Sequence, residues 1–366
     1  MLPSAKPLRS PQLHASLIAA YAKETNPLAR AILEASIDAA GGQRYGYISQ
    51  LYWYTDLGEA QAAAKAQRKP ILSLRLLGNL TEELTCANSR FFRVMYYANS
   101  EISAYLRDNY VLHWSSERPV PKVTVDFGDG RVLKTTVTGN SIHYVLDEQG
   151  RVIDYLPSLQ APNRFLSQVR SAKTAWQGVE GKPEAVRYTS LLAFHTGLRV
   201  ARADAQRIGD GQRLALDIGA QLDAQSLAIT KMASESLVTR GILPPGTFAD
   251  PTRGERDEWA RRGAALVAAS AETPMFDAAS LALMRTLRPD LGDAQLRDLE
   301  QSVLADTAIG ELVLRTQIDS FAPALRFGDL AALNRVVYDN VFLTRGDDPW
   351  LNMASLGVFD GLPVAF

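Results

Sequence analysis

A single cysteine, Cys86, is the residue whose type is best suited to chemistry in this chain. Ser89 lies where a dithiol redox motif would have its second cysteine, so the segment has CxxS spacing. We expect Cys86 at the first turn of a helix, where unpaired backbone N–H groups and the helix dipole favour the nucleophilic thiolate. The Ser89 hydroxyl and the Arg90 cation, one turn later, would stabilise the same sulfur. The expected catalytic residues are therefore Cys86, Ser89 and Arg90.

The chemistry open to Cys86 is limited because the chain has no second cysteine and cannot close an internal disulfide. A lone thiolate can form a mixed disulfide with a protein or a small thiol, or be oxidised by peroxide to a sulfenic acid that an external thiol resolves. The alternative is structural, since an unpaired cysteine is often a small, buried hydrophobe. Burial or exposure of the sulfur distinguishes the two interpretations.

A second group of residues, His113, Trp114, Glu117 and Arg118, lies at the carboxyl end of a predicted core strand and just beyond it. Sheets of α/β proteins usually carry their sites there. We expect His113, Trp114 and Arg118 to contact a substrate or to tune the thiol. The alternative is a loop that is anchored by Trp114 and by contacts of Arg118.

Composition excludes several classes of partner. The chain has 39 basic and 40 acidic residues and a net charge of −1, so no overall field attracts nucleic acid or an anionic membrane. It has no GxSxG, HExxH or P-loop motif, and its Gly128–Gly130 segment is typical of a turn. We therefore expect no cofactor, no metal, no nucleic acid and no membrane. The first ten residues lack the apolar core of a signal peptide, which favours a soluble cytoplasmic protein, or a periplasmic or secreted one if a leader was removed.

Hydrophobic periodicity and breaker residues divide the chain into elements. Two helices are predicted within 11–40, and the later pattern is almost entirely helical from 183 to 345. The middle of the chain alternates helices with strands, as follows: a helix over 58–68, a strand over 71–74, helices through 97 and over 100–108, a strand over 110–114, a hairpin over 123–137, paired strands over 142–146 and 152–156, and a helix over 163–176.

This order of elements resembles the thioredoxin-like superfamily over roughly residues 50–172. Three stretches carry the resemblance. They are the W…D…EA…KPI pattern from Trp53 to Ser73, the helix ending in Asn109-Tyr110-Val111, and Thr138-Gly139 through Asp147-Glu-Gln-Gly150-Arg-Val152, which is similar to the family's G-T-P-T…D-x-x-G-x-V hairpin. The resemblance implies a three-layer α/β domain. In this domain, the loop before the paired strands over 142–146 and 152–156 faces the cysteine and binds substrate. It therefore adds Asn140 and Ser141 as expected substrate contacts.

The sequence departs from the family pattern at three places. Cys86 lies twelve positions after Leu74, so residues 75–85 form an insertion; Ser89 replaces the resolving cysteine; and Ser141 stands where typical members have a cis-proline. His143, close to Ser141, could be a copper ligand with Cys86, as in copper chaperones of the same fold. Those proteins normally use two cysteines, which favours a core histidine instead.

The sequence thus predicts a thioredoxin-like α/β domain over 50–177, an N-terminal helical arm over 1–49, and a helical C-terminal region and tail over 178–366. The last region either covers one face of the sheet or forms a surface for a protein partner. The predicted function is a single-cysteine thiol oxidoreductase acting on a protein or small-molecule thiol. The alternative is a non-catalytic thioredoxin-fold scaffold or protein-interaction module.

Overall fold

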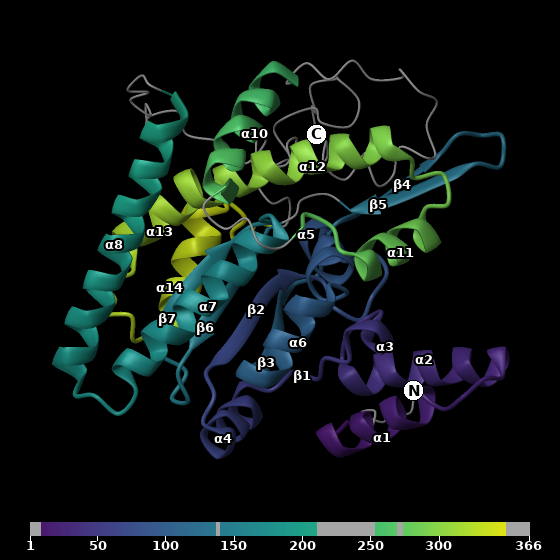
Figure 1. The fold of residues 1–366 in the computed structure, drawn as a ribbon, viewed down its shortest axis with the longest axis horizontal. Helices are drawn as coiled ribbons and strands as arrows, with labels where there is room; N and C mark the ends of the chain where they lie inside the picture. The colour runs from purple at the N-terminus through teal and green to yellow at the C-terminus, as the bar shows by residue number, and fades with distance from the viewer. Residues whose placement is uncertain (1–8, 137–139, 211–252, 269–273, 349–366) are drawn as a thin grey trace.

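A five-stranded mixed sheet forms the centre of the structure, a computed structural model that describes residues 9–136, 140–210, 253–268 and 274–348 (Figure 1). The strand order is β1-β3-β2-β6-β7; β1, β3 and β2 run parallel, whereas β6 and β7 are antiparallel to their neighbours. A separate hairpin, β4-β5, extends away from the sheet. The strands are β1 (Trp53–Tyr54), β2 (Ile71–Leu77), β3 (Val111–Arg118), β4 (Lys122–Asp126), β5 (Val132–Thr136), β6 (Ser141–Leu146) and β7 (Val152–Pro157).

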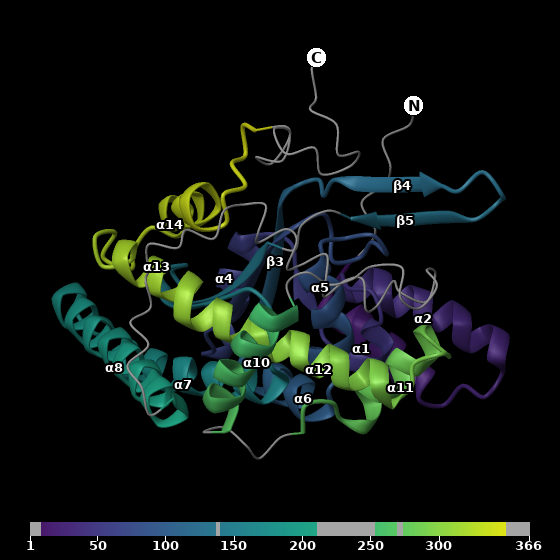
Figure 2. The same cartoon turned by 90° about the horizontal axis from the view of Figure 1, so that it is seen from above.

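Helices cover both faces of the sheet (Figure 2). Helix α14 lies on one side, and α6 and α7 lie on the other. The helices before the hairpin are α1 (Pro11–Tyr21), α2 (Pro27–Gly41), α3 (Gly46–Ser49), α4 (Leu57–Gln67), α5 (Ala87–Phe91), the π-helix η1 (Phe92–Tyr96) and α6 (Ser100–Asn109). Those after the sheet are α7 (Pro162–Val179), α8 (Glu184–Asp210), α10 (Arg253–Ala268), α11 (Ala278–Leu287), α12 (Asp293–Ala308), η3 (Ile309–Leu314), α13 (Arg315–Phe321), α14 (Leu330–Val336) and η4 (Val337–Val341).

Local sequence signals explain where several helices begin. Ser10 and Asn26 accept hydrogen bonds from backbone N–H groups of α1 and α2, and a proline follows each of them at the start of the helix. Asp56 and Asn99 cap α4 and α6 in the same way. Such side-chain caps satisfy donors that the first turn leaves unpaired. The helices and strands predicted in these stretches are confirmed.

Strand β3 differs from its predicted form. It was expected to end at Trp114, but it continues to Arg118 because β2 pairs with it along its whole length, with a bulge near the end. Glu117 and Arg118 therefore lie within the strand and not in a loop after it. Strand β2 likewise runs to Leu77, so the expected insertion is reduced to a loop over 78–85.

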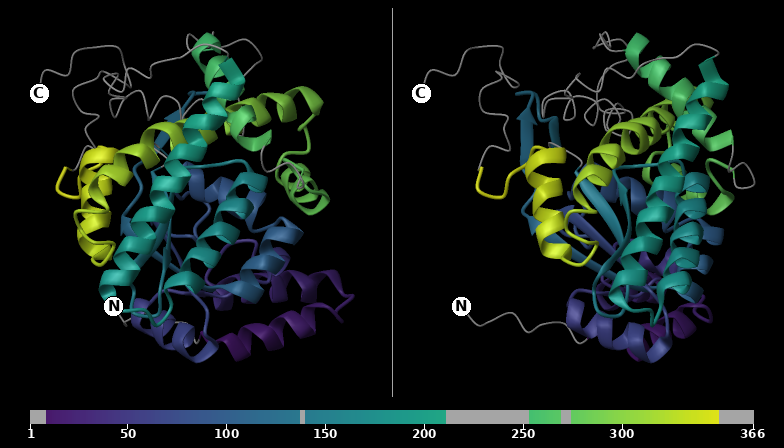
Figure 3. Two further views of the ribbon diagram at one scale, coloured as in Figure 1. Left: turned by 60° about the vertical axis from the view of Figure 1, so that its left-hand side comes forward. Right: turned by 90° about the vertical axis from the view of Figure 1, so that its left-hand side faces the viewer.

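One hydrophobic core joins the sheet to the C-terminal helices. The same cluster of buried side chains extends from Leu51 and Trp53, through Phe92 and Tyr144, to Phe342. Of the two expectations for the C-terminal region, the described part follows the first, because its helices cover the sheet. Helices α1 and α2 form an arm at the edge of the molecule, distant from α8 and α10 (Figure 3).

Parts of two predicted regions lie outside the described residues. They are 211–252 and 269–273 of the predicted helical pattern, and the tail from 349 onward. Among the described helices, none has the length and apolar composition needed to cross a bilayer.

Candidate functional site

Cys86 lies where the sequence places it, at the N-terminal end of α5. Its backbone N–H donates to the carbonyl oxygen of Leu77, the last residue of β2, with an N–O distance of 3.2 Å. Helix α5 continues directly into the π-helix η1. The strand thus fixes the start of the helix and the cysteine with it.

The sulfur of Cys86 is fully buried, with 0% of the residue exposed. Its thiol donates to Ser89 Oγ at 3.4 Å, so the two residues of the CxxS spacing do meet. The Ser89 oxygen also lies 2.8 Å from the Cys86 carbonyl oxygen and 3.0 Å from Thr85 Oγ1. Ser89 is therefore held by backbone and side-chain contacts of the same helix turn.

Two buried tyrosines that sequence reasoning missed interact electrostatically with the cysteine. Burial raises the pKa of Tyr97 well above its usual value, and Tyr96 and Cys86 act in the same direction. Burial also raises the pKa of Tyr338 well above its usual value, with further contributions from Glu117 and Cys86. Tyr97 follows η1, whereas Tyr338 belongs to η4, far along the chain. The electrostatic environment of the thiol therefore includes a residue of the C-terminal helices.

Arg90, the third expected catalytic residue, is directed toward the hairpin. Its Nη2 donates to Thr136 Oγ1 at 3.1 Å, and that hydroxyl donates to the carbonyl oxygen of Thr85 at 3.1 Å. Arg90 thereby connects α5 to the end of β5. Its side chain also lines a pocket on the far side of α5.

The two expected substrate contacts, Asn140 and Ser141, are both buried. Ser141 opens β6 opposite Leu76, and its Oγ has no hydrogen-bond partner among the described residues. No cis peptide bond occurs in the described part of the chain, so Ser141 is in the trans form. Asn140 Nδ2 donates to the carbonyl oxygen of Phe342 at 3.3 Å, and its own carbonyl oxygen accepts from the Tyr338 hydroxyl at 3.4 Å. Residues of the C-terminal region therefore form hydrogen bonds with the loop that was expected to bind substrate.

His113 and Trp114 point to structural partners. His113 Nδ1 lies 2.8 Å from Ser73 Oγ on the neighbouring strand, and burial lowers the pKa of His113 to about 3. Trp114 Nε1 donates to the carbonyl oxygen of Gly42 at 2.8 Å, which joins the sheet to the end of α2. These two residues sit on successive positions of β3, so their side chains leave opposite faces of the sheet.

Arg118 and Glu117 border a polar pocket of about 390 Å³ between the carboxyl ends of β2 and β3 and helix α14. Arg118 donates to the carbonyl oxygens of Arg345 and Asp348. Glu117 lies 3.4 Å from Arg75 Nη1 and accepts from Asn334 Nδ2 at 2.8 Å. Burial raises the pKa of Glu117, although Arg75 opposes the shift. Tyr338 also lines this pocket.

His143 has the properties of a core histidine. It is 1% exposed, and burial lowers its pKa to about 3. Its Nε2 lies 2.8 Å from the Tyr97 hydroxyl, and its ring packs against Phe92 and Phe165. No group of three or more potential metal ligands occurs among the described residues. The burial, the hydrogen bond and the ring contacts of His143 agree with the interpretation of a hydrogen-bonded core residue.

A buried network of charges, which sequence reasoning also missed, joins the C-terminal helices to β7. Arg315 of α13 forms an ion pair with Asp154 of β7, and Arg202 of α8 forms one with Asp319. His195 is stacked between Tyr155 and another aromatic ring, and its Nε2 lies 3.0 Å from the carbonyl oxygen of Ile153. These residues look like ordinary members of helices and of a strand in the sequence, so no local pattern signals the network.

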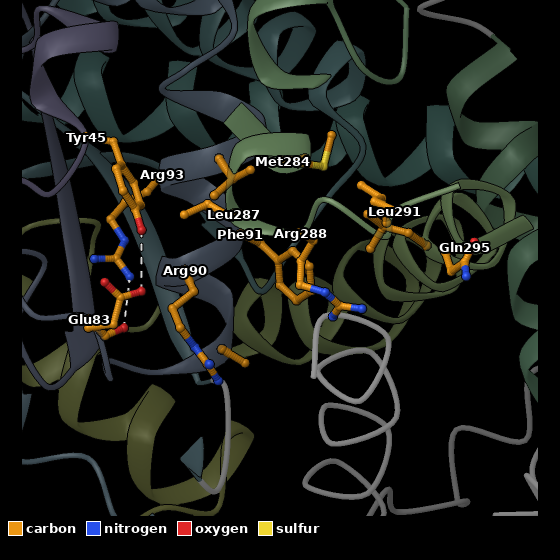
Figure 4. A pocket seen from close by; sticks show the side chains of 13 residues that line it. Tyr45, Glu83, Arg90, Phe91, Arg93, Met284, Leu287, Arg288, Leu291 and Gln295 are labelled. Atoms are coloured by element: carbon orange, nitrogen blue, oxygen red, sulfur yellow. Dashed lines mark hydrogen bonds between the residues drawn. The ribbon is translucent and has the colours of Figure 1, made fainter. Parts of the chain in front are cut away.

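A second pocket, of about 250 Å³, lies between η1 and helix α11 (Figure 4). Tyr45, Glu83 and Arg93 gather at one end, and Leu291 and Gln295 lie at the other. Most of the side chains between them are apolar. No sequence motif points to this pocket, because its walls come from segments almost 200 residues apart.

Comparison with known proteins gives no further guidance to the site. The chain matches no protein-family model, and neither curated proteins nor solved structures include a significantly similar chain.

Proposed function

We propose that this protein is a non-catalytic scaffold with a thioredoxin-like sheet, acting as a protein-interaction module in which Cys86 is structural. The observation that carries the proposal is the complete burial of Cys86, whose residue is 0% exposed. A thiol must reach its substrate to react, and reactive cysteines are partly exposed. The thiol here donates to Ser89 inside the core.

The thioredoxin-like part of the proposal is supported by the sheet. Its strand order is β1-β3-β2-β6-β7, with three parallel strands followed by an antiparallel pair. The helix after β2 begins at Cys86, which is the place of the reactive cysteine in the family that the sequence resembles. The final helix of the pattern, α7, packs on β6 and β7.

The non-catalytic part is supported by the contacts of Asn140. Members of a thiol oxidoreductase family need free backbone groups in this loop to bind an extended substrate. Here the Tyr338 hydroxyl donates to the Asn140 carbonyl oxygen, and the Asn140 side chain donates to Phe342. The chain thus satisfies with its own residues the groups that a substrate would use.

Thiol accessibility tests the proposal directly. We expect iodoacetamide and a maleimide to label Cys86 in the folded protein no faster than the protein unfolds, and completely in urea. The Cys86→Ala variant, used to complement loss of the wild-type protein in cells, should retain full biological activity. Stoichiometric labelling of the folded protein within minutes, or sulfenic acid formation with peroxide, would contradict the proposal.

The second candidate is a single-cysteine thiol oxidoreductase, and the contact between Cys86 and Ser89 favours it. In that reaction the Cys86 thiolate attacks a disulfide of a partner, a mixed disulfide forms, and the partner's other sulfur leaves as a thiolate. The step requires the buried sulfur to become accessible, and movement of η4, whose Tyr338 donates to Asn140, would open the loop that is expected to face the thiol. Tyr338→Ala should then give rapid disulfide exchange at Cys86, whereas Tyr338→Phe should not. Slow labelling of a folded Tyr338→Ala variant would rule out this candidate.

A further inference from the structure

The pocket between η1 and α11 combines apolar walls with a buried positive charge. Its apolar lining comes from both sides: Phe91 and Val94 belong to α5 and η1, whereas Met284 and Leu287 belong to α11 and Leu291 follows it. At one end lies Arg93, which is 1% exposed. Burying a charge is unfavourable unless an opposite charge compensates it, so a negatively charged group would stabilise the Arg93 guanidinium.

The partners of Arg93 do not supply one. Its guanidinium donates to the carbonyl oxygens of Leu80, Glu82 and Glu83, and its Nε has no hydrogen-bond partner among the described residues. Within the described part of the chain, no carboxylate forms an ion pair with Arg93; the nearby Glu83 carboxylate pairs with Arg44.

The electrostatics of the pocket agree with this geometry. Burial lowers the pKa of Arg93 to about 10; Tyr45 and Glu83 oppose the shift, and the charges of Arg44 and Arg90 add to it. The side chains that line the pocket include those of Arg90, Arg93 and Arg288 and one carboxylate, that of Glu83. Arg288 pairs with Asp290 and Glu83 pairs with Arg44, so the positive charge at the pocket comes mainly from Arg93. An anionic group entering the pocket would meet a positive potential.

We propose that this pocket binds a small amphipathic carboxylate, with its apolar chain against α11 and its carboxylate directed to the end that holds Arg93. The apolar walls match a hydrocarbon chain, and pockets with apolar walls and a few polar groups are the usual form of small-molecule sites. A volume of about 250 Å³ is below the range of about 300 to 1,000 Å³ for drug-sized ligands, so the ligand is short. The proposal does not depend on the state of Cys86.

Three probes of equal chain length separate the role of charge from that of the apolar chain. They are octanoate, octanol and octylamine, and binding to the full chain is measured by titration calorimetry. We expect octanoate to bind with one-to-one stoichiometry, octanol at least tenfold more weakly, and octylamine not at all. Equal binding of octanoate and octanol, or no binding of octanoate, would overturn the proposal.

A pair of matched variants locates the binding site. Leu287 is 41% exposed on α11 and lines the pocket, whereas Leu192 is 37% exposed on α8 and does not. Leu287→Asp adds a carboxylate to the pocket and should weaken octanoate binding at least tenfold by repelling the ligand. Leu192→Asp makes the same change elsewhere and should leave binding unchanged. If both variants bind octanoate like the wild type, the ligand lies outside this pocket.

Two further checks keep the result separate from folding and from the proposed function. Both leucines are partly exposed, so both variants should show the far-UV circular dichroism of the wild type. Octanoate binding by the Cys86→Ala variant should equal that of the wild type. With this control, evidence for a reactive Cys86 would not contradict the carboxylate site. Equally, a lack of octanoate binding would not contradict a structural role of Cys86.

Discussion

Arg93 and Arg315 are buried to the same extent, with 1% of each exposed, but their surroundings differ. Burial lowers the pKa of Arg93 to about 10, because only carbonyl oxygens accept its hydrogen bonds. Burial also acts to lower the pKa of Arg315, but the carboxylates of Asp154 and Asp319 outweigh it and raise the pKa. The Nε of both arginines lacks a hydrogen-bond partner among the described residues, so the difference lies in the counter-charges.

The comparison separates two regions by their counter-charges. In one, carboxylates of the protein compensate a buried arginine; in the other, carbonyl oxygens are the acceptors of its hydrogen bonds. Around Arg315, carboxylates from β7 and α13 neutralise the guanidinium and join the C-terminal helices to the sheet. Around Arg93, the positive charge faces an apolar pocket. A self-neutralised cluster supports the fold, whereas a buried charge beside a cavity is suited to a ligand.

The largest effect is expected from breaking the self-neutralised region. Arg315→Met leaves the Asp154 carboxylate buried without its counter-charge, and removal of one partner of a buried pair costs about 3 to 5 kcal/mol. We expect a loss of this size in the free energy of unfolding, measured with urea. The matched variant Arg93→Met removes bonds to neutral carbonyl oxygens and relieves repulsion from Arg44 and Arg90. It should therefore cost less than Arg315→Met, and an equal or larger loss would contradict the comparison.

Much of the fold was predictable because its signals are local. Ser10, Asn26 and Asp56 cap helices at the positions where their residue types indicate a helix start. The contact between Cys86 and Ser89 was predictable too, since residues three apart on a helix lie on the same side.

The surroundings of the candidate site were not predictable, because they depend on contacts between distant segments. Tyr338 reaches the carbonyl oxygen of Asn140 from almost 200 positions along the chain. Asn334 reaches Glu117 across a similar separation. Strand β3 was predicted too short for a related reason: residues 115–118 lack the apolar pattern of a strand, and pairing with β2 keeps them extended.

A second prediction concerns the pH dependence of stability that follows from two buried histidines, His113 and His143. Burial lowers the pKa of His143 and of His113 from 6.5 to about 3. Below pH 6.5 the unfolded chain binds protons that the folded protein does not bind, so stability falls as the pH decreases and is lost progressively down to about pH 3. Each histidine contributes up to about 1.4 kcal/mol per pH unit to this slope.

The slope can be measured by urea unfolding at several pH values between neutrality and the range where carboxylates titrate. His143→Gln removes one titrating group and should make the slope shallower by up to about 1.4 kcal/mol per pH unit. His113→Gln should do the same, and the double variant should show the sum. An unchanged slope in His143→Gln would mean that this ring already carries its proton in the folded state.

The smallest effect is expected at the buried neutral pair of Cys86 and Ser89, where no charge has to be compensated. A hydrogen bond between uncharged groups contributes about 1 kcal/mol to stability. We expect a loss of about this size for Ser89→Ala, because Ser89 Oγ contacts both the Cys86 thiol and the Cys86 carbonyl oxygen. A double-mutant cycle with Cys86→Ala isolates the thiol contact, and its coupling energy should be below about 1 kcal/mol. If Ser89 instead stabilised a reactive thiolate, Ser89→Ala in a Tyr338→Ala background would shift the pH dependence of Cys86 labelling. If Ser89 is structural, the substitution lowers stability and leaves the pH dependence of labelling unchanged.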